Sequence, residues 1–358
     1  MFLAYLSKLI IIINDGRKLV FKFLKTYFAV FAVFASLAAL SPNEVFSKEI
    51  KVGSFVSAKG FGSRFVIMPW MKRATEALNK IGSKTTIKAY WGGSLGKSPF
   101  QQYDLVKGGV ADVAWVMAAY TPGQFPEMEV MEIPFLFRTA NEASVVGWKL
   151  HQAGLFSGFQ DTHLVGFFAG EPASIFSRDP ISKLEDLKNR KVRIVGATQG
   201  DWLRTLGAVP ERASSRKMNE KLNRGTFSAV IQGWSGMKTF KSLGLVNHTV
   251  DVPVGTLGFM LLMNKDTWNG LSSGEKKAVQ ENGGIHIAKD SGKAYAKAGI
   301  DIRAMVKSQG KHKMITFSQS QLAAYEKAAQ PVHQRWASKN SANKKTYEAA
   351  VRFLKELR

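Results

Sequence analysis

The chain has 358 residues, of which 45% are hydrophobic and 22% are charged, and its formal net charge at pH 7 is +23. This composition is typical of a globular protein, and the length allows two domains that each bury a core. The chain contains no cysteine, which excludes disulfide bonds, cysteine-ligated zinc and thiol nucleophiles.

The first 47 residues have the pattern of a secretory signal peptide. Four basic residues lie between positions 17 and 25, an uncharged run of 14 residues follows over 27–40, and Ser47 precedes a predicted cleavage site at Lys48. The run is shorter than the roughly 20 residues of a membrane-spanning helix, and its setting is that of a signal peptide. An uncleaved anchor is the alternative. We therefore expect a periplasmic protein, and residues 1–16, atypical of a signal, suggest a start assigned too early.

The positive charge remains after the leader is removed. The leader carries five basic and two acidic residues, so its removal lowers the net charge from +23 to +20. Such a charge raises the possibility of nucleic-acid binding, but the basic residues are scattered and form no long block. We interpret the charge as a solvated surface that attracts anionic solutes, and we expect no nucleic-acid partner.

In chain order, strands alternate with helices. A strand is expected at 50–55, and a helix follows in which Trp70, Ala74, Leu78 and Ile81 share one face. Further strands are expected at 86–90, 112–117, 164–169, 191–195 and 227–231, and capping patterns at Thr139, Ser182, Ser272 and Ser318 open further helices. This order predicts an α/β fold with mostly parallel sheets, in which ligands bind beyond the carboxyl ends of strands.

The turn WGGSLGKSP over 91–99 ends in Gly-Lys-Ser, as a phosphate-binding loop does. Such a loop needs a glycine five positions before Gly96, where this chain has Trp91. Gly92 and Gly93 favour a sharp bend between a strand and a helix instead. We interpret the segment as a structural turn, and we expect no cofactor.

No catalytic constellation is evident in the sequence. It contains neither Gly-x-Ser-x-Gly nor His-Glu-x-x-His, and its six histidines do not cluster at metal-ligand spacing. We interpret His248 as a structural residue, and Glu127 and Glu129, between prolines, as solvated loop residues. A binding protein therefore fits better than an enzyme, and a hydrolase or isomerase stays the alternative.

Several short segments carry a family pattern. They are WGGSLG at 91–96, VKGGVAD at 106–112, AYTPGQFP at 119–126, IPFLF at 133–137, LEDLKNRKVR at 184–193, LGAVP at 206–210 and MNK at 263–265. In this order they resemble the extracytoplasmic solute receptors of the TRAP (tripartite ATP-independent periplasmic) transporters, the DctP family.

The resemblance implies a two-lobed type II periplasmic binding fold whose lobes are joined by crossing strands and a long helix. We expect one lobe at 48–170 and 253–300, and the other at 171–252 and 301–358 with the C-terminal helices. The resemblance also implies a receptor, monomeric or dimeric, that delivers small organic acids, dicarboxylates included, to an ion-gradient-driven membrane permease. A receptor that feeds a sensor is the alternative.

The resemblance places the carboxylate-binding arginine of the family at Arg193. A guanidinium pairs with a carboxylate through two parallel hydrogen bonds, and strand alternation puts Arg193 opposite the apolar pair Val192 and Ile194. The other ligand-binding candidates of the site are Trp115, Tyr120, Phe168, Glu171 and Trp234, and no metal ligand is predicted.

Two departures from the family pattern bear on the ligand. Some receptors carry a second arginine near the position of Glu171, so a second carboxylate clamp is in doubt here. The pattern G-x-V-D-G becomes GTFSA over 225–229 and loses its aspartate, which alters the wall of the second lobe. In the pattern D-L-K-G, Asn189 replaces the glycine and can still adopt a left-handed turn.

Overall fold

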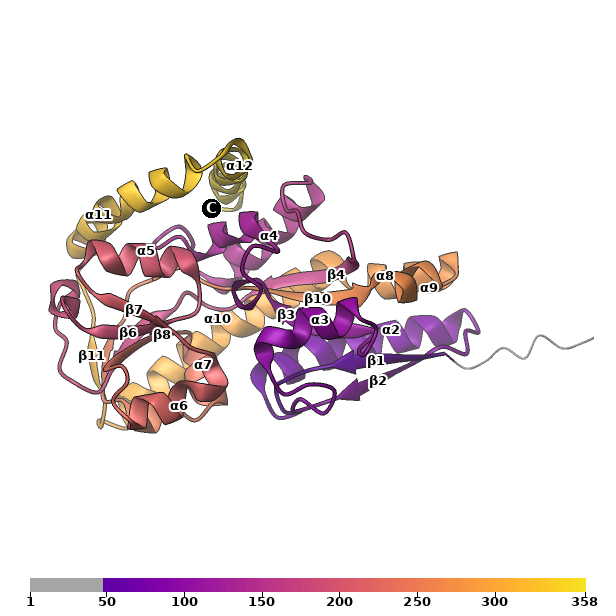
Figure 1. Ribbon diagram of the computed structural model, residues 1–358, viewed down its shortest axis with the longest axis horizontal. Helices are drawn as coiled ribbons and strands as arrows, with labels where there is room; N and C mark the ends of the chain where they lie inside the picture. Colours follow the sequence, from indigo (N-terminus) through magenta and orange to yellow (C-terminus); the bar gives the residue numbers. More distant parts are fainter. Residues whose placement is uncertain (1–47) are drawn as a thin grey trace, which may run out of the picture. The chain divides into compact units, whose positions relative to one another are not determined.

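Residues 48–358 are described by a computed structural model of the chain, in which the strands form two sheets (Figure 1). The predicted signal peptide lies outside the described residues. Within 48–358, every helix is too short or too polar to cross a membrane.

The first sheet, sheet A, has the strand order β2-β1-β3-β10-β4. Its strands are β1 (Glu49–Gly53), β2 (Thr86–Tyr90), β3 (Val113–Met117), β4 (Thr162–Ala169) and β10 (Gly258–Asn264). Along β3, Val113 and Trp115 face a cluster with α2 (Met68–Lys80) and α9 (Ser273–Glu281), whereas Ala114 and Val116 face α3 (Gln102–Lys107) and α4 (Ala140–Gln152). Helices therefore cover both faces, which explains the continuous apolar run of β3.

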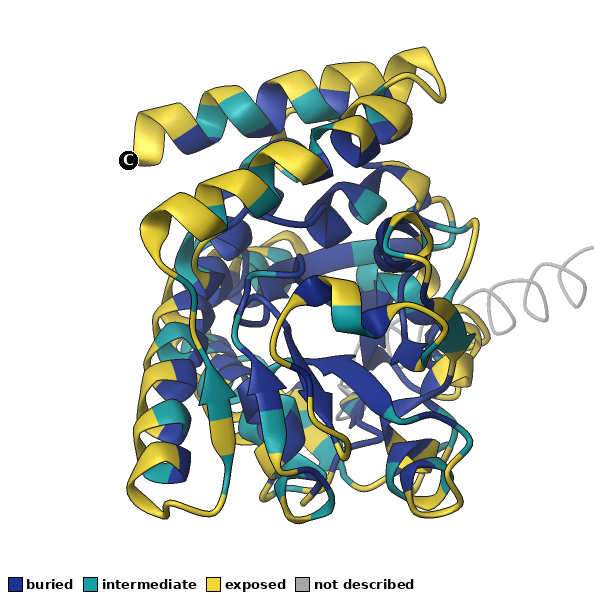
Figure 2. Ribbon diagram, turned by 90° about the vertical axis from the view of Figure 1, so that its left-hand side faces the viewer, coloured by how far each residue is buried: buried dark blue, intermediate teal, exposed yellow. Residues whose placement is uncertain are grey.

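The second sheet, sheet B, has the order β11-β9-β5-β8-β6-β7. Its strands are β5 (Ser174–Ser177), β6 (Lys191–Ile194), β7 (Val209–Arg212), β8 (Ala229–Gln232), β9 (His248–Val250) and β11 (Lys313–Ile315). Val192 and Ile194 pack with α5 (Ala197–Thr205) and α11 (Gln319–Ala337), and the other face packs with α6 (Ser215–Asn223) and α7 (Trp234–Thr239). Figure 2 shows the strands largely buried and the outer helix faces exposed.

Both sheets are mixed, but in each of them all strands except one run in the same direction, which confirms the expectation of mostly parallel sheets. Every antiparallel pairing among the described strands involves β5 or β10. These two strands follow the points at which the chain crosses from one sheet to the other. At the edge of each sheet where the chain crosses over, β5 or β10 begins while its neighbouring strands end. Each of these two strands therefore runs antiparallel to its neighbours.

A single long helix, α10 (Gly284–Ser308), packs on both sheets. Ile287 and Tyr295 belong to the core of sheet A, and Ile302 and Val306 to that of sheet B. A Cβ atom at Gly292 would lie 2.8 Å from the Cα atom of Asn141 in α4, so this close approach requires glycine. The helix thus joins the two lobes, as the family resemblance implied.

The last helix, α12 (Ser341–Leu357), packs on α4 beside sheet A. Its Ala350 and Leu354 share a core cluster with Trp148. The expected lobe boundaries, with residues 48–170 and 253–300 in the first lobe and residues 171–252 and 301–358 in the second, remain a proposal. Because α12 packs on α4, we propose that residues 341–357 belong to the first lobe instead.

Local predictions from capping patterns are confirmed at three helices. Thr139, Ser272 and Ser318 each accept a hydrogen bond from the backbone N–H three residues on. At Ser182 the helix is a short 3-10 turn, Leu184–Leu187, and both Ser182 donors bind Asp186 rather than Glu185. The remaining short helices are Ser63–Ile67, Pro99–Gln101, Ala118–Tyr120, Pro126–Glu132, Leu243–Leu245 and α8 (Lys265–Asn269).

The glycine turn after β2 is structural, as the sequence predicted. Gly92 and Gly93 have φ angles of +70° and +84°, which glycine adopts without steric cost. Their N–H groups donate to the carbonyls of Val56 and Ser54 at 3.0 and 2.8 Å. These donors are occupied by the protein backbone and cannot cradle a phosphate.

Candidate functional site

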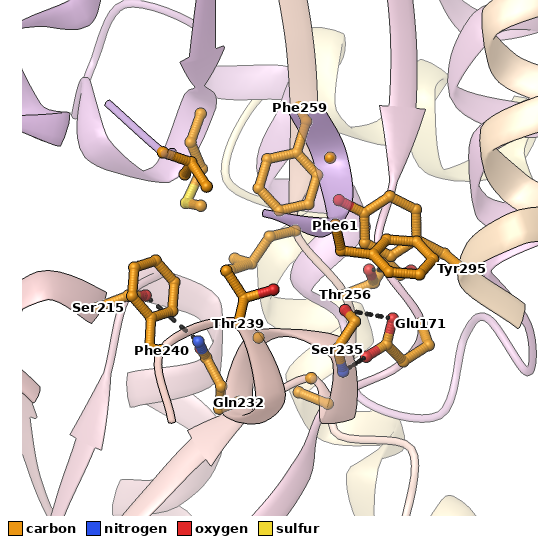
Figure 3. Close-up of a pocket in the computed structure, with 18 of the residues that line it drawn as sticks. Phe61, Glu171, Ser215, Gln232, Ser235, Thr239, Phe240, Thr256, Phe259 and Tyr295 are labelled. Carbon is orange, nitrogen blue, oxygen red and sulfur yellow. Dashed lines mark hydrogen bonds between the residues drawn. The ribbon is translucent and has the colours of Figure 1, made fainter. Parts of the chain in front are cut away.

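A pocket lies where the two sheets face each other, and residues from both lobes line it (Figure 3). The side chains that carry the argument are Phe55, Phe61, Trp115 and Phe259 from the side of sheet A, Ser215, Gln232, Ser235 and Phe240 from the side of sheet B, and Glu171, Gln199, Thr256 and Tyr295. The empty volume is about 710 Å³, part of it open to solvent. This size suits a small organic molecule.

Aromatic rings form much of the wall. The ring centres of Phe61 and Tyr295 are 4.6 Å apart, and those of Trp115 and Phe259 are 5.6 Å apart. Such rings bury apolar surface and favour offset or edge contacts with another ring. The middle of the pocket therefore suits an apolar, ring-sized body.

Arg193 lies behind one end of this pocket and does not line it. Its side chain is fully buried, and it donates to the carbonyls of Ala213 and Ile231 at 2.9 and 3.1 Å. It also donates to Gln232 Oε1 at 2.9 Å and to Ser215 Oγ at 3.2 Å. In the described part of the chain it has neutral partners only, and burial lowers its pKa. A nearby anion would stabilise such a buried cation.

Gln232 and Ser215 connect Arg193 to the pocket, since both contact the guanidinium and both line the cavity. Because Arg193 holds Gln232 Oε1, the amide nitrogen of Gln232 points elsewhere and donates to Ser215 Oγ at 3.3 Å. An amide nitrogen carries two N–H groups, so one is left over. This end of the pocket therefore presents a donor with a positive charge behind it.

Glu171 lies on the opposite side of the pocket, with Ser235, Thr256 and Tyr295 (Figure 3). Its two oxygens accept hydrogen bonds from Ser235 N at 2.6 Å and from Ser235 Oγ at 3.0 Å. The carboxyl group is buried, and this burial raises its pKa. The nearby Arg303 is paired with Asp251 at 2.8 Å, so Glu171 has no ion pair within residues 48–358.

Two further polar atoms of the wall have no hydrogen-bond partner in the described chain. They are Trp115 Nε1, a donor, and Gln199 Oε1, an acceptor, and both atoms are buried. Buried polar groups are almost always hydrogen-bonded in folded proteins. A bound molecule is the natural partner for them. Within residues 48–358, no three His, Asp or Glu side chains come together as a metal site.

The sequence of residues 69–340 matches the family DctP, bacterial extracellular solute-binding protein, family 7. The chain belongs to this family. The DctP-family chain is 23% identical over 334 residues to the outer membrane transporter protein TsaT of Comamonas testosteroni, covering 89% of this chain and 95% of that protein. It is 24% identical over 268 residues to the C4-dicarboxylate-binding periplasmic protein DctP of Rhodobacter capsulatus, and this match covers 72% of this chain and 78% of that protein.

Solved structures of TRAP solute-binding proteins have the same two-lobed fold. A marine metagenome protein in complex with 3-hydroxybenzoate superposes with a TM-score of 0.78 at 24% identity, covering 86% of this chain and 98% of that one. A Rhodoferax ferrireducens protein with copurified benzoate superposes with a TM-score of 0.79 at 23% identity, and the match covers 86% of this chain and 98% of that one. A Shewanella oneidensis protein with bound succinate superposes with a TM-score of 0.73 at 16% identity, and the match covers 86% of this chain and 99% of that one. The DctP-family assignment thus makes the chain a solute-binding protein for transport rather than an enzyme.

Of the six site residues predicted from the sequence, the structure places Trp115 and Glu171 on the pocket wall. Tyr120 and Arg193 lie behind Ser215, whose backbone N–H donates to the Tyr120 hydroxyl at 2.9 Å. Phe168 is buried behind Trp115 and Phe259, with ring centres at 5.9 and 5.1 Å.

Trp234 is also away from the pocket wall. It is fully buried, and its Nε1 donates to Ser174 Oγ and Asp251 Oδ1 at 3.1 and 3.3 Å. The contacts around Trp234 are those of a core residue.

The interpretation of Glu127 as solvated is wrong. Glu127 is buried and accepts hydrogen bonds from Ser157 N and Oγ at 3.0 and 2.6 Å. Glu129 is half-buried and pairs with Lys339 at 3.6 Å. His248 lies in β9 and contacts Asn247, away from the pocket.

Most of the aromatic wall was missed at the level of sequence. Phe61, Phe240 and Tyr295 come from distant segments, and no spacing distinguishes them among the 24 phenylalanines and 8 tyrosines. Gln232 carried a usable signal, because it is the last residue of strand β8, which pairs in parallel with β6, and ligands bind beyond the carboxyl ends of such strands.

Proposed function

We propose that this protein is the extracytoplasmic receptor of a TRAP-type transporter and binds a small carboxylic acid with an apolar, ring-sized body. The single observation that carries this proposal is Arg193, a buried cation whose partners within residues 48–358 are all neutral, directly behind Gln232 and Ser215 of an aromatic pocket. The carboxylate of the ligand would bind at the Gln232 and Ser215 end.

Delivery to an ion-gradient-driven membrane permease follows from the family and completes the proposal. The two crossings of the chain and α10 form the hinge region, and the lobes separate to admit the ligand and close over it. The relatives bound to benzoate and 3-hydroxybenzoate support an aromatic acid. A signal peptide at 1–47 would bring the receptor to the periplasm.

The test is the thermal stability of residues 48–358, which form one unit with its own cores, against a panel of acids. The panel contains benzoate and 3-hydroxybenzoate, aliphatic acids of similar size, and succinate. A ligand present at 100 times its Kd raises the free energy of unfolding by about 2.7 kcal/mol. We expect stabilisation by aromatic acids, and no stabilisation by any acid of the panel would contradict the proposal.

A further inference from the structure

The pocket has a buried basic group behind one end and a buried acidic group at the other. Arg193 supplies a buried positive charge behind Gln232 and Ser215, and Glu171 supplies a buried carboxyl group on the opposite side. Neither has an ion-pair partner in the described part of the chain. A charged group that is buried without a partner costs folding free energy, so the two ends together suit a ligand that carries both charges.

The surroundings of Glu171 favour a cationic amine over any other group. The rings of Phe61 and Tyr295, 4.6 Å apart, lie on the same side of the pocket as Glu171 (Figure 3). Aromatic faces attract ammonium groups, and a carboxylate among them supplies the counter-charge. A second carboxylate of a ligand would instead be repelled by an ionised Glu171.

Acceptors for an ammonium group are also present. The two hydrogen bonds that Ser235 donates to the Glu171 oxygens leave lone pairs on both of them. Gln199 Oε1 is a buried acceptor with no donor in the described chain. An ammonium group has three N–H donors to satisfy, and the pocket offers more than one acceptor.

We propose that the ligand is a zwitterion, with its carboxylate at the Gln232 and Ser215 end, an apolar body between the rings, and an amino group bound by Glu171. This inference rests on the proposed function, since it assigns the far end of the same ligand. It makes Glu171 the residue that selects amino acids of this shape over dicarboxylates such as succinate.

The experiment measures the affinity of residues 48–358 by calorimetry for three benzoates of nearly equal size. They carry an aminomethyl, a hydroxymethyl or an ethyl substituent, each tested as the meta and the para isomer. We expect the aminomethyl compound to bind most tightly, by about tenfold or more over the ethyl compound, as a charge-assisted hydrogen bond provides.

Glu171→Gln keeps the size of the side chain and removes its charge. In this variant the preference for the aminomethyl over the ethyl compound should disappear. Glu127→Gln is the matched control, because Glu127 is also buried and held by the N–H and Oγ of one serine, outside the pocket. It should leave the preference intact.

The outcomes separate the two proposals. If the ethyl and hydroxymethyl compounds bind as tightly as the aminomethyl compound, or if Glu171→Gln leaves the ranking unchanged, the zwitterion is wrong while the carboxylate receptor stands. If none of the three benzoates and no acid of the earlier panel binds, the proposed function itself fails.

Discussion

Arg193 is the residue on which ligand binding is proposed to depend. Arg193→Met removes the buried charge at similar side-chain length, and we expect it to weaken binding of an aromatic acid by on the order of 2–5 kcal/mol. Arg193→Lys keeps a charge but loses the planar fork, so its loss should be smaller. Calorimetry gives both affinities.

The fold of these variants needs its own measurement, because Arg193 also donates to the carbonyls of Ala213 and Ile231. Thermal unfolding of the unliganded variants shows whether they remain folded. A folded Arg193→Met protein that binds the acid as tightly as the parent would remove Arg193 from the proposal.

At the scale of elements, the start of α6 contacts the first lobe across the pocket. Arg216, in its first turn, donates to the carbonyl of Phe55 at 3.1 Å, and Ser215 contacts Tyr120. Arg216→Ala should weaken ligand binding by about 0.5–1.5 kcal/mol, the value of one hydrogen bond, mainly through faster dissociation. Stopped-flow displacement of the ligand measures this rate.

A matched control lies at the other end of the same helix. Arg224 is exposed, and its ion-pair partner within residues 48–358 is Glu220, one turn away, at 3.1 Å. Arg224→Ala should leave the dissociation rate unchanged. Equal rates for the Arg216 and Arg224 variants would show that the α6 contact plays no part in holding the ligand.

Elements defined by local signals were predictable from the sequence, and the pocket was not. The caps at Thr139, Ser272 and Ser318 and the turn at Gly92 depend on neighbouring residues only. The direction of β5 and β10 depends on where the chain crosses between sheets, and periodicity carries no information about that.

The residues of the site also divide into those that local sequence signals predicted and those that they did not. Trp115, in the apolar run of β3, and Glu171, just after β4, were found because strand ends mark ligand sites. The burial of Arg193 behind Gln232 could not be foreseen, because it depends on the packing of α6 against two strands.

At the scale of the whole molecule, Glu132 should lower the stability of the fold as the pH rises from about 5 to 8. Glu132 is buried, and its burial with the nearby charge of Glu129 raises its pKa from 4.5 to about 8. The folded state therefore holds the proton more tightly, and the destabilisation grows from pH 4.5 upward to about 5 kcal/mol above pH 8.

Glu132→Gln removes this titration and keeps an acceptor for the N–H of Thr198, which Glu132 binds at 3.0 Å. Urea unfolding between pH 5 and 9 should show that the stability of the parent falls relative to that of the variant as the pH rises. Parallel curves would mean that Glu132 titrates alike in the folded and unfolded states.

The most direct test of the account is a crystal structure of residues 48–358 with bound benzoate. The account predicts the carboxylate within hydrogen-bond distance of Gln232 and Ser215, in front of Arg193, and the ring among the aromatic side chains of the pocket. A benzoate bound outside this pocket, or one whose carboxylate lies against Glu171, would contradict it.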